Sequence, residues 1–103
     1  MITKVEINES IQSKLDKDIK DGLFNKEVRE LIAFWIMDIS DIGYEEYIKS
    51  PLAESFGDHK LKNSRQGERS IHLNESGGRL IYKYYKKKII VKVIKITAEH
   101  DYL

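Results

Sequence analysis

The sequence contains a single proline, no cysteine and no long apolar run. The last two absences each exclude a class of protein. Without cysteine the chain has no disulfide, no thiolate nucleophile and no cysteine-ligated zinc. The longest apolar run, residues 31–37, is far shorter than the roughly 18 residues of a membrane-spanning helix. The first residues lack the apolar segment of a signal peptide. These absences predict a cytoplasmic protein that does not enter a membrane.

The length of 103 residues is enough for one domain with one hydrophobic core. The sequence shows no internal repeat and no low-complexity tract that would mark a second unit. We therefore expect a single domain over residues 1–103.

The net charge of +1 conceals an uneven distribution of charge along the chain. Residues 1–57 hold 7 Lys or Arg against 12 Asp or Glu, which gives −5. Residues 58–103 hold 11 Lys or Arg against 5 Asp or Glu, which gives +6. A basic half predicts a surface that binds a polyanion such as nucleic acid. The alternative is a lysine-rich sheet face that is only solvated.

The first half predicts one strand and two helices. Residues 3–7 alternate in polarity and favour a strand, and Asn8 is a suitable cap for a helix that ends near Gly22. Asn25 is a suitable cap for a second helix that ends near Gly43. Residues 44–49 predict a further short helical turn. The apolar positions that recur every three or four residues are Ile11, Leu15 and Ile19 in the first helix, and Val28, Leu31, Ile32, Trp35, Ile36 and Ile39 in the second.

The second half predicts three antiparallel strands. Residues 57–68 are polar and predict a loop, after which residues 69–73, 79–85 and 89–96 have the alternation or β-branched content of strands. Short turns separate them, so they form a meander in which the middle strand lies between the other two. The fold class is therefore α+β, with the helices packed on one face of an antiparallel sheet.

The three histidines of the chain are predicted to meet in one cleft. His59 lies in the polar loop, His72 lies on the strand face opposite Ile71, and His100 follows the last strand of the meander. Basic residues surround them in the sequence. These are Lys60, Lys62, Arg65 and Arg69.

Imidazoles that converge can bind zinc or act as an acid and a base near neutral pH. The cationic surroundings and the absence of a short-spaced ligand pair disfavour zinc, so no metal is expected. Acid–base chemistry on an anionic phosphodiester fits better. RNA cleavage needs little else, because the ribose 2′-hydroxyl supplies the nucleophile. The cluster Tyr82, Tyr84 and Tyr85 can stack bases or pack on the sheet, and we favour packing.

Four short segments of the second half resemble the YafQ-like branch of the RelE toxin superfamily and follow one another in the order that this branch shows. The members of the superfamily are toxins of type II toxin–antitoxin systems. The branch shows an Asp-His-x-Leu loop, a Gly-x-Arg-x-x-His element, a Leu-Ile-Tyr-Lys strand and a closing histidine. The segments lie in the last 46 residues, and the first half agrees as a strand followed by two helices. They are DHKL (58–61), GERSIHL (67–73), RLIYKY (79–84) and ITAEHDYL (96–103).

The resemblance implies an mRNA interferase, a ribosome-dependent endoribonuclease that a cognate antitoxin protein neutralises. It implies that His59, His72 and His100 are catalytic and that Arg69 stabilises the scissile phosphate. It also implies RNA-contacting basic residues at Lys60 and Lys62, and we expect Arg65, Arg79 and Tyr102 to bind RNA as well. An acidic antitoxin segment would cover the basic cleft, and the helical half would form part of its binding surface.

One departure from the family pattern concerns the carboxylate. The family commonly carries an acid and a tryptophan where this chain has Gly77 and Gly78, and Glu75 is the nearest carboxylate. Glu75 takes over the acid/base role, or the histidines and cations suffice, or the activity is weakened. The alternative function is a non-catalytic RNA- or protein-binding module of the same fold.

Overall fold

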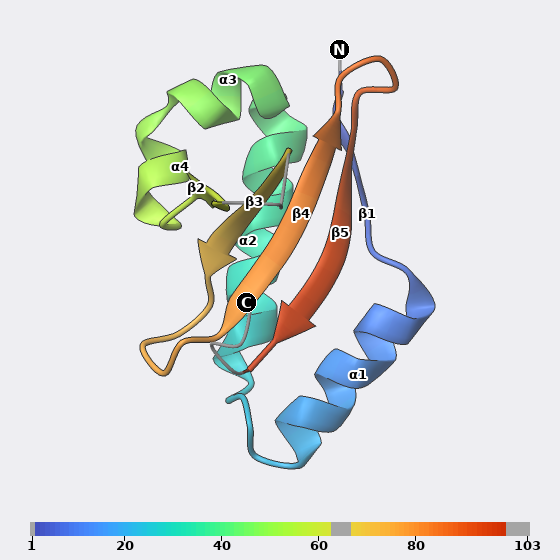
Figure 1. Ribbon diagram of the computed structural model, residues 1–103, viewed down its shortest axis with the longest axis vertical. Helices are drawn as coiled ribbons and strands as arrows, with labels where there is room; N and C mark the ends of the chain where they lie inside the picture. Colours follow the sequence, from blue (N-terminus) through green and yellow to red (C-terminus); the bar gives the residue numbers. More distant parts are fainter. Residues whose placement is uncertain (1, 63–66, 99–103) are drawn as a thin grey trace.

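The computed structural model describes residues 2–62 and 67–98. The order of elements is strand, four helices, then four strands (Figure 1). They are β1 (Lys4–Glu6), α1 (Glu9–Lys20), α2 (Glu27–Ile42), α3 (Tyr44–Lys49), α4 (Pro51–Ser55), β2 (His59–Lys60), β3 (Glu68–His72), β4 (Arg79–Tyr85) and β5 (Ile90–Thr97).

The strands form one five-stranded mixed sheet in the order β1-β5-β4-β3-β2. β3, β4 and β5 make the predicted antiparallel meander, with β4 between its neighbours. β1 lies parallel to β5 at one edge, so that Val5 is opposite Val91. The α+β class predicted from the sequence is therefore confirmed.

The prediction of an unbroken loop over residues 57–68 is wrong at three positions, because Glu68 begins β3 and two further residues form a strand of their own. His59 and Lys60 form β2, which pairs with Ser70 and Arg69 of β3 at the other edge of the sheet. Two residues are too few to show an alternating pattern, so only the pairing with β3 reveals this strand.

Side-chain caps mark the starts of two of the four described helices, α1 and α4. Asn8 caps α1, because its Oδ1 accepts a hydrogen bond from the Ile11 amide at 2.9 Å. The predicted cap at Asn25 is wrong, since α2 begins one residue later than such a cap requires and the preceding residue, Lys26, makes no side-chain cap hydrogen bond. The short helix α3 is confirmed. α4 goes beyond the sequence prediction, although Ser50 caps it and Pro51 occupies its first position.

The core lies between the helices and one face of the sheet. In Figure 1, α2 passes behind β3 and β4. Its fully buried Trp35 packs against Tyr82 of β4 with ring centroids 5.1 Å apart. The apolar stripe of α1 joins the same core through Leu15. None of the helices in the described ranges is long and apolar enough to cross a membrane.

Candidate functional site

The sheet face that points away from the core carries mostly polar and basic residues, and four of its residues, Ser70, Arg79, Ile81 and Thr97, are buried. Residues directly opposite one another on paired strands share a face, so the register defines this surface. Glu68 of β3 lies opposite Lys83 of β4, which lies opposite Lys92 of β5. We call this surface the outer face, and it consists of Glu68, Ser70, His72, Arg79, Ile81, Lys83, Lys92, Lys95 and Thr97, with His59 of β2 at its edge.

His59 and His72 lie together at one edge of the outer face. Their ring centroids are 5.8 Å apart, the rings meet edge to face, and both residues are exposed. His59 is fixed through Nδ1, which lies 2.8 Å from the carbonyl oxygen of Gly57. The His72 amide donates to the carbonyl oxygen of Phe56 at 2.9 Å. The structure thus brings together two of the three predicted imidazoles, while His100 lies outside the described residues.

Arg69 does not join the histidine pair. It alternates with Ser70 on β3, so its side chain lies on the core side of the sheet. There its Nε donates to Asp58 Oδ1 at 2.6 Å, and the Asp58 side chain is fully buried. The guanidinium expected to meet a phosphate is therefore held by an internal carboxylate. The alternation along β3 could have predicted this orientation, because Arg69 lies two positions from the core residue Ile71 and so points to the same side of the sheet.

Asp58 is the centre of a buried hydrogen-bond network. Its Oδ2 accepts from the hydroxyls of Tyr47 at 2.8 Å and Tyr82 at 2.5 Å. Tyr47 in turn accepts from the indole of Trp35 at 3.0 Å. Burial first, and the Asp58 charge second, raise the pKa of both tyrosines far above its ordinary value. Both hydroxyls thus remain protonated donors to the carboxylate.

Arg79, and not the predicted Arg69, is the arginine that lies next to the histidine pair. It lies directly opposite His72 on the outer face, is largely buried, and donates through Nη1 to the Gly78 carbonyl at 3.0 Å. Lys60 lies opposite Arg69 on β2, so it shares the core-side parity at the edge of the sheet, and its side chain is exposed. Lys62 is exposed just beyond. Arg65 and Tyr102 fall outside the described residues.

Glu75 shares a cavity with one of the histidines. The cavity has a volume of about 400 Å³ and is lined by residues of α2, α4 and the β3–β4 turn, among them His72, Glu54 and Glu75. A carboxylate is therefore available on the His72 side of the pair, as the alternative involving Glu75 requires.

Gly77 and Gly78 stand where the YafQ-like branch commonly carries an acid and a tryptophan. The packing around Gly78 explains why that position is a glycine. Gly78 is buried, and a Cβ there would lie 2.6 Å from the ring of Phe24 and 3.0 Å from Oδ1 of Asn74. Phe24 of the α1–α2 connection thus fills the space that a larger side chain at Gly78 would need. The departure is built into the core and is not confined to a surface turn.

The lysines of the outer face were not among the predicted site residues. Lys83, Lys92 and Lys95 come from β4 and β5, and the alternation of those strands was the signal that could have identified them. Tyr82 is fully buried and Tyr84 stacks on Tyr44 with centroids 4.2 Å apart, which confirms packing for these two tyrosines. Tyr85 is exposed, with the Lys83 ammonium 5.5 Å from its ring centroid.

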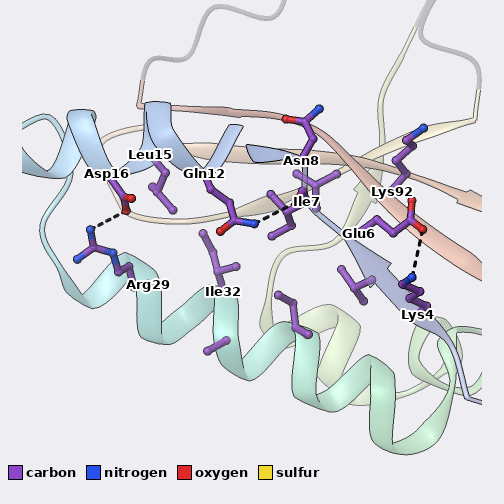
Figure 2. A pocket seen from close by; sticks show the side chains of 14 residues that line it. Lys4, Glu6, Ile7, Asn8, Gln12, Leu15, Asp16, Arg29, Ile32 and Lys92 are labelled. Carbon is purple, nitrogen blue, oxygen red and sulfur yellow. Dashed lines mark hydrogen bonds and ion pairs between the residues drawn. The ribbon is translucent and has the colours of Figure 1, made fainter. Parts of the chain in front are cut away.

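A larger cavity of about 740 Å³ lies among β1, α1 and α2, and none of the predicted site residues that the structure describes lines it (Figure 2). Its walls are mostly apolar. Its carboxylates are paired, Asp16 with Arg29 at 2.7 Å and Glu6 with Lys4 at 3.8 Å, as the dashed lines in Figure 2 mark. This helix groove is suited to receive apolar side chains, and it offers no group for acid–base chemistry. In the described ranges, no cluster of three or more His, Asp or Glu is arranged to hold a metal ion.

No protein-family model and no curated protein matches the sequence. Three solved structures from Helicobacter pylori share its architecture. A copper-bound mutant toxin has 22% identity and a TM-score of 0.59, and the match covers 93% of this chain and 92% of that one. The conserved hypothetical protein HP0892 has 19% identity, a TM-score of 0.56 and 96% coverage of each chain. HP0894 has 22% identity, a TM-score of 0.54 and coverages of 93% and 92%.

The chain therefore has the same α+β fold as these three solved structures, one of which is a toxin. At these identities the likeness concerns the fold, so any chemistry has to be argued from the residues that this chain places on its outer face.

Proposed function

We propose that this protein is an mRNA interferase toxin of the YafQ-like type, a ribosome-dependent endoribonuclease. The observation that carries the proposal is the His59–His72 pair, exposed at the edge of a basic sheet face. An exposed imidazole pair beside Arg79 provides both proton transfer and charge stabilisation for phosphodiester cleavage. The likeness of the chain's fold to that of a solved toxin structure supports the same proposal.

The reaction begins when the ribose 2′-hydroxyl attacks the adjacent phosphorus. His59 or His72 accepts the hydroxyl proton, and the bond from phosphorus to the 5′-oxygen breaks. His100 supplies the proton that the leaving 5′-oxygen needs, which leaves a 2′,3′-cyclic phosphate that water can open to a 3′-phosphate. Arg79 is largely buried opposite His72, so it favours the negative charge of the phosphorane-like transition state through its electric field and not by direct contact, while Lys83 and Lys95 hold the RNA backbone. Glu75 lines the same cavity as His72, which supports a role for it in orienting His72 or in sharing its acid/base role.

Cleavage is tested by translating a defined mRNA in a purified system and mapping its ends by primer extension. We expect the wild type to cut, and His59→Ala, His72→Ala and His100→Ala to reduce cutting by at least about 100-fold, the usual contribution of a general acid or base. Lys20→Ala, at the end of α1, is the control and should cut like the wild type. Undiminished cutting by the histidine variants, or no cutting by the wild type with or without ribosomes, would contradict the proposal.

The second candidate function is a non-catalytic RNA- or protein-binding module. The glycines at 77 and 78, in place of the family's acid and tryptophan, favour it. It predicts that RNA binding depends on the lysines of the outer face, whereas the histidine substitutions leave function unchanged. The cleavage experiment above separates the two candidates.

We also propose a cognate antitoxin as the protein partner. An acidic segment would cover the outer face, and apolar side chains of the same partner would enter the helix groove. Co-expression with each short reading frame that adjoins the gene tests this. We expect one product to co-purify with the toxin and restore growth, and the paired change Lys83→Glu and Lys95→Glu to weaken its capture. Capture that these charges do not affect would contradict the assigned surface.

A further inference from the structure

The turn that precedes β2 contacts both imidazoles of the pair. The carbonyl oxygen of Phe56 accepts the His72 amide at 2.9 Å, and the carbonyl oxygen of Gly57 lies 2.8 Å from Nδ1 of His59. The Cα of Gly57 faces the imidazole ring of His72 at close range. A short backbone segment, residues 56–58, is thus the element that the two rings share.

We propose that Gly57 is the positioning residue of the histidine pair and that buried Asp58 anchors it. Gly57 would select the tautomer of His59 through its carbonyl and make room for the ring of His72 through its missing side chain. The inference rests on the proposed function, because it concerns the same two imidazoles, and it assigns His59 as the base.

The tautomer follows from the chemistry of the hydrogen bond. A carbonyl oxygen only accepts, so a neutral His59 that bonds to Gly57 must carry its proton on Nδ1. The lone pair is then on Nε2, and the described residues form no hydrogen bond with that atom. A neutral imidazole with an available Nε2 lone pair is the form that accepts the proton of a ribose 2′-hydroxyl. His59 is therefore the base of the pair.

The absent side chain of Gly57 matters because of the His72 ring. A Cβ at this position would lie 2.5 Å from Cδ2, 3.0 Å from Cγ and 3.1 Å from Nε2 of His72. All three atoms belong to one rigid ring, so the ring could only move as a whole. Any side chain at position 57 would therefore push His72 away from its present place beside His59.

Asp58 holds the turn from the core side, independently of the imidazoles. Its carboxylate is fully buried and accepts from Arg69, Tyr47 and Tyr82. Its amide donates to the carbonyl oxygen of Ala53 at 3.0 Å, and the Gly57 amide donates to that of Glu54 at 2.9 Å. The position of the turn is therefore set by α4 and the buried network. The turn then positions the two histidines through its backbone contacts with them.

The wild-type protein tests the tautomer without any substitution or RNA. Long-range ¹H–¹⁵N spectra of the imidazoles are recorded about two pH units above the ordinary imidazole pKa of about 6.5. We expect the His59 nitrogens to show the Nδ1–H tautomer and an Overhauser effect to connect the His59 and His72 rings. An Nε2–H tautomer at His59 would overturn the inference.

A matched pair of glycine substitutions tests the spacing. Gly57 and Gly22 both have positive φ, +67° and +80°, but a Cβ at Gly22 meets nothing within 4 Å. Both Gly57→Ala and Gly22→Ala carry backbone strain, and only Gly57→Ala displaces a ring. We expect Gly57→Ala to abolish the Overhauser effect between the rings and to reduce the cleavage rate at least tenfold, and Gly22→Ala to change neither. A retained Overhauser effect in Gly57→Ala, or an equal reduction of cleavage in Gly22→Ala, would contradict the positioning role.

The two proposals fail separately. If the spectra show the expected tautomer and ring proximity but the wild type never cuts RNA, the nuclease proposal is wrong and the placement by Gly57 stands. If the wild type cuts and Gly57→Ala cuts equally well, the nuclease proposal stands and the positioning role is wrong.

Discussion

At the residue scale, Asp58 is the buried charge on which the site depends. It is fully buried, and it compensates Arg69, whose side chain is only one-fifth exposed. The hydrogen bond and charge of Asp58 raise the pKa of Arg69 against the opposing effect of burial. Removing either partner would destabilise the fold, because a buried ion that loses its counter-ion retains the full desolvation cost.

Removing the Asp58 carboxylate should therefore be strongly destabilising. We expect Asp58→Ala to lower the free energy of unfolding by about 3–5 kcal/mol, the range for breaking a buried pair. The control is Asp16→Ala, which removes an exposed carboxylate paired with Arg29 and should cost less than about 1 kcal/mol. Urea denaturation measures both, and equal losses would show that Asp58 is not a buried anchor.

The tyrosines bound to Asp58 should make the protein sensitive to alkali. The pKa values of Tyr47 and Tyr82 are raised when folded, chiefly by burial, so above about pH 10 the unfolded chain loses protons that the folded protein keeps. Their contribution is complete below about pH 10 and falls above it, by up to about 1.4 kcal/mol per pH unit for each tyrosine. Urea denaturation between about pH 9 and pH 11 measures this slope, and Tyr82→Phe should reduce it.

At the element scale, two asparagines that look equivalent in the sequence have different roles. Asn8 caps α1 through the amide of Ile11, whereas Asn25 precedes α2 and contributes only its backbone carbonyl, which accepts from the Val28 amide. A side-chain cap satisfies a helix amide that otherwise lacks a partner. A helix start without one has no such bond to lose.

We accordingly expect Asn8→Ala to cost about 1 kcal/mol of stability and Asn25→Ala less than about 0.5 kcal/mol. Thermal denaturation followed by circular dichroism compares the two variants under one set of conditions. A loss at position 25 as large as that at position 8 would mean that α2 is capped in solution by a side chain.

At the scale of the whole molecule, the charge division of the sequence becomes a division between faces. α2 carries Glu27, Glu30, Asp38 and Asp41 against the single base Arg29. β4 and β5 place Arg79 and three lysines on the outer face. A polyanion is therefore attracted to the sheet side and repelled from the acidic helix α2.

RNA binding should consequently depend steeply on salt. Removing one lysine that neutralises a phosphate should reduce the slope of log K against log salt by about 0.7 for a single strand. We expect Lys83→Ala and Lys95→Ala each to show this reduction in fluorescence titrations of a short RNA between low and high salt. Lys20→Ala on α1 is the control, and an equal change there would place the RNA elsewhere.

The sequence by itself determined every described element except β2 and α4, because the signals of the others are local. The period of α2, the alternation of β4, the Asn8 cap and the short helix at 44–49 each depend on residues within a few positions of one another. The same locality gave the α+β class and the order of the meander. It also placed His72 on the face opposite Ile71, since alternation along one strand fixes that relation.

Only the tertiary structure decided which side chains meet. Asp58 and Arg69 are eleven positions apart. They pair because β2 lies against β3, and β2, with two residues, is too short to predict from the sequence. That pairing removes Arg69 from the histidine pair and leaves Arg79 opposite His72. The contact by which Phe24 excludes a larger side chain at Gly78 likewise joins two segments that are far apart in the sequence. Contacts between distant segments depend on how the sheet closes over its core, and no local pattern records them.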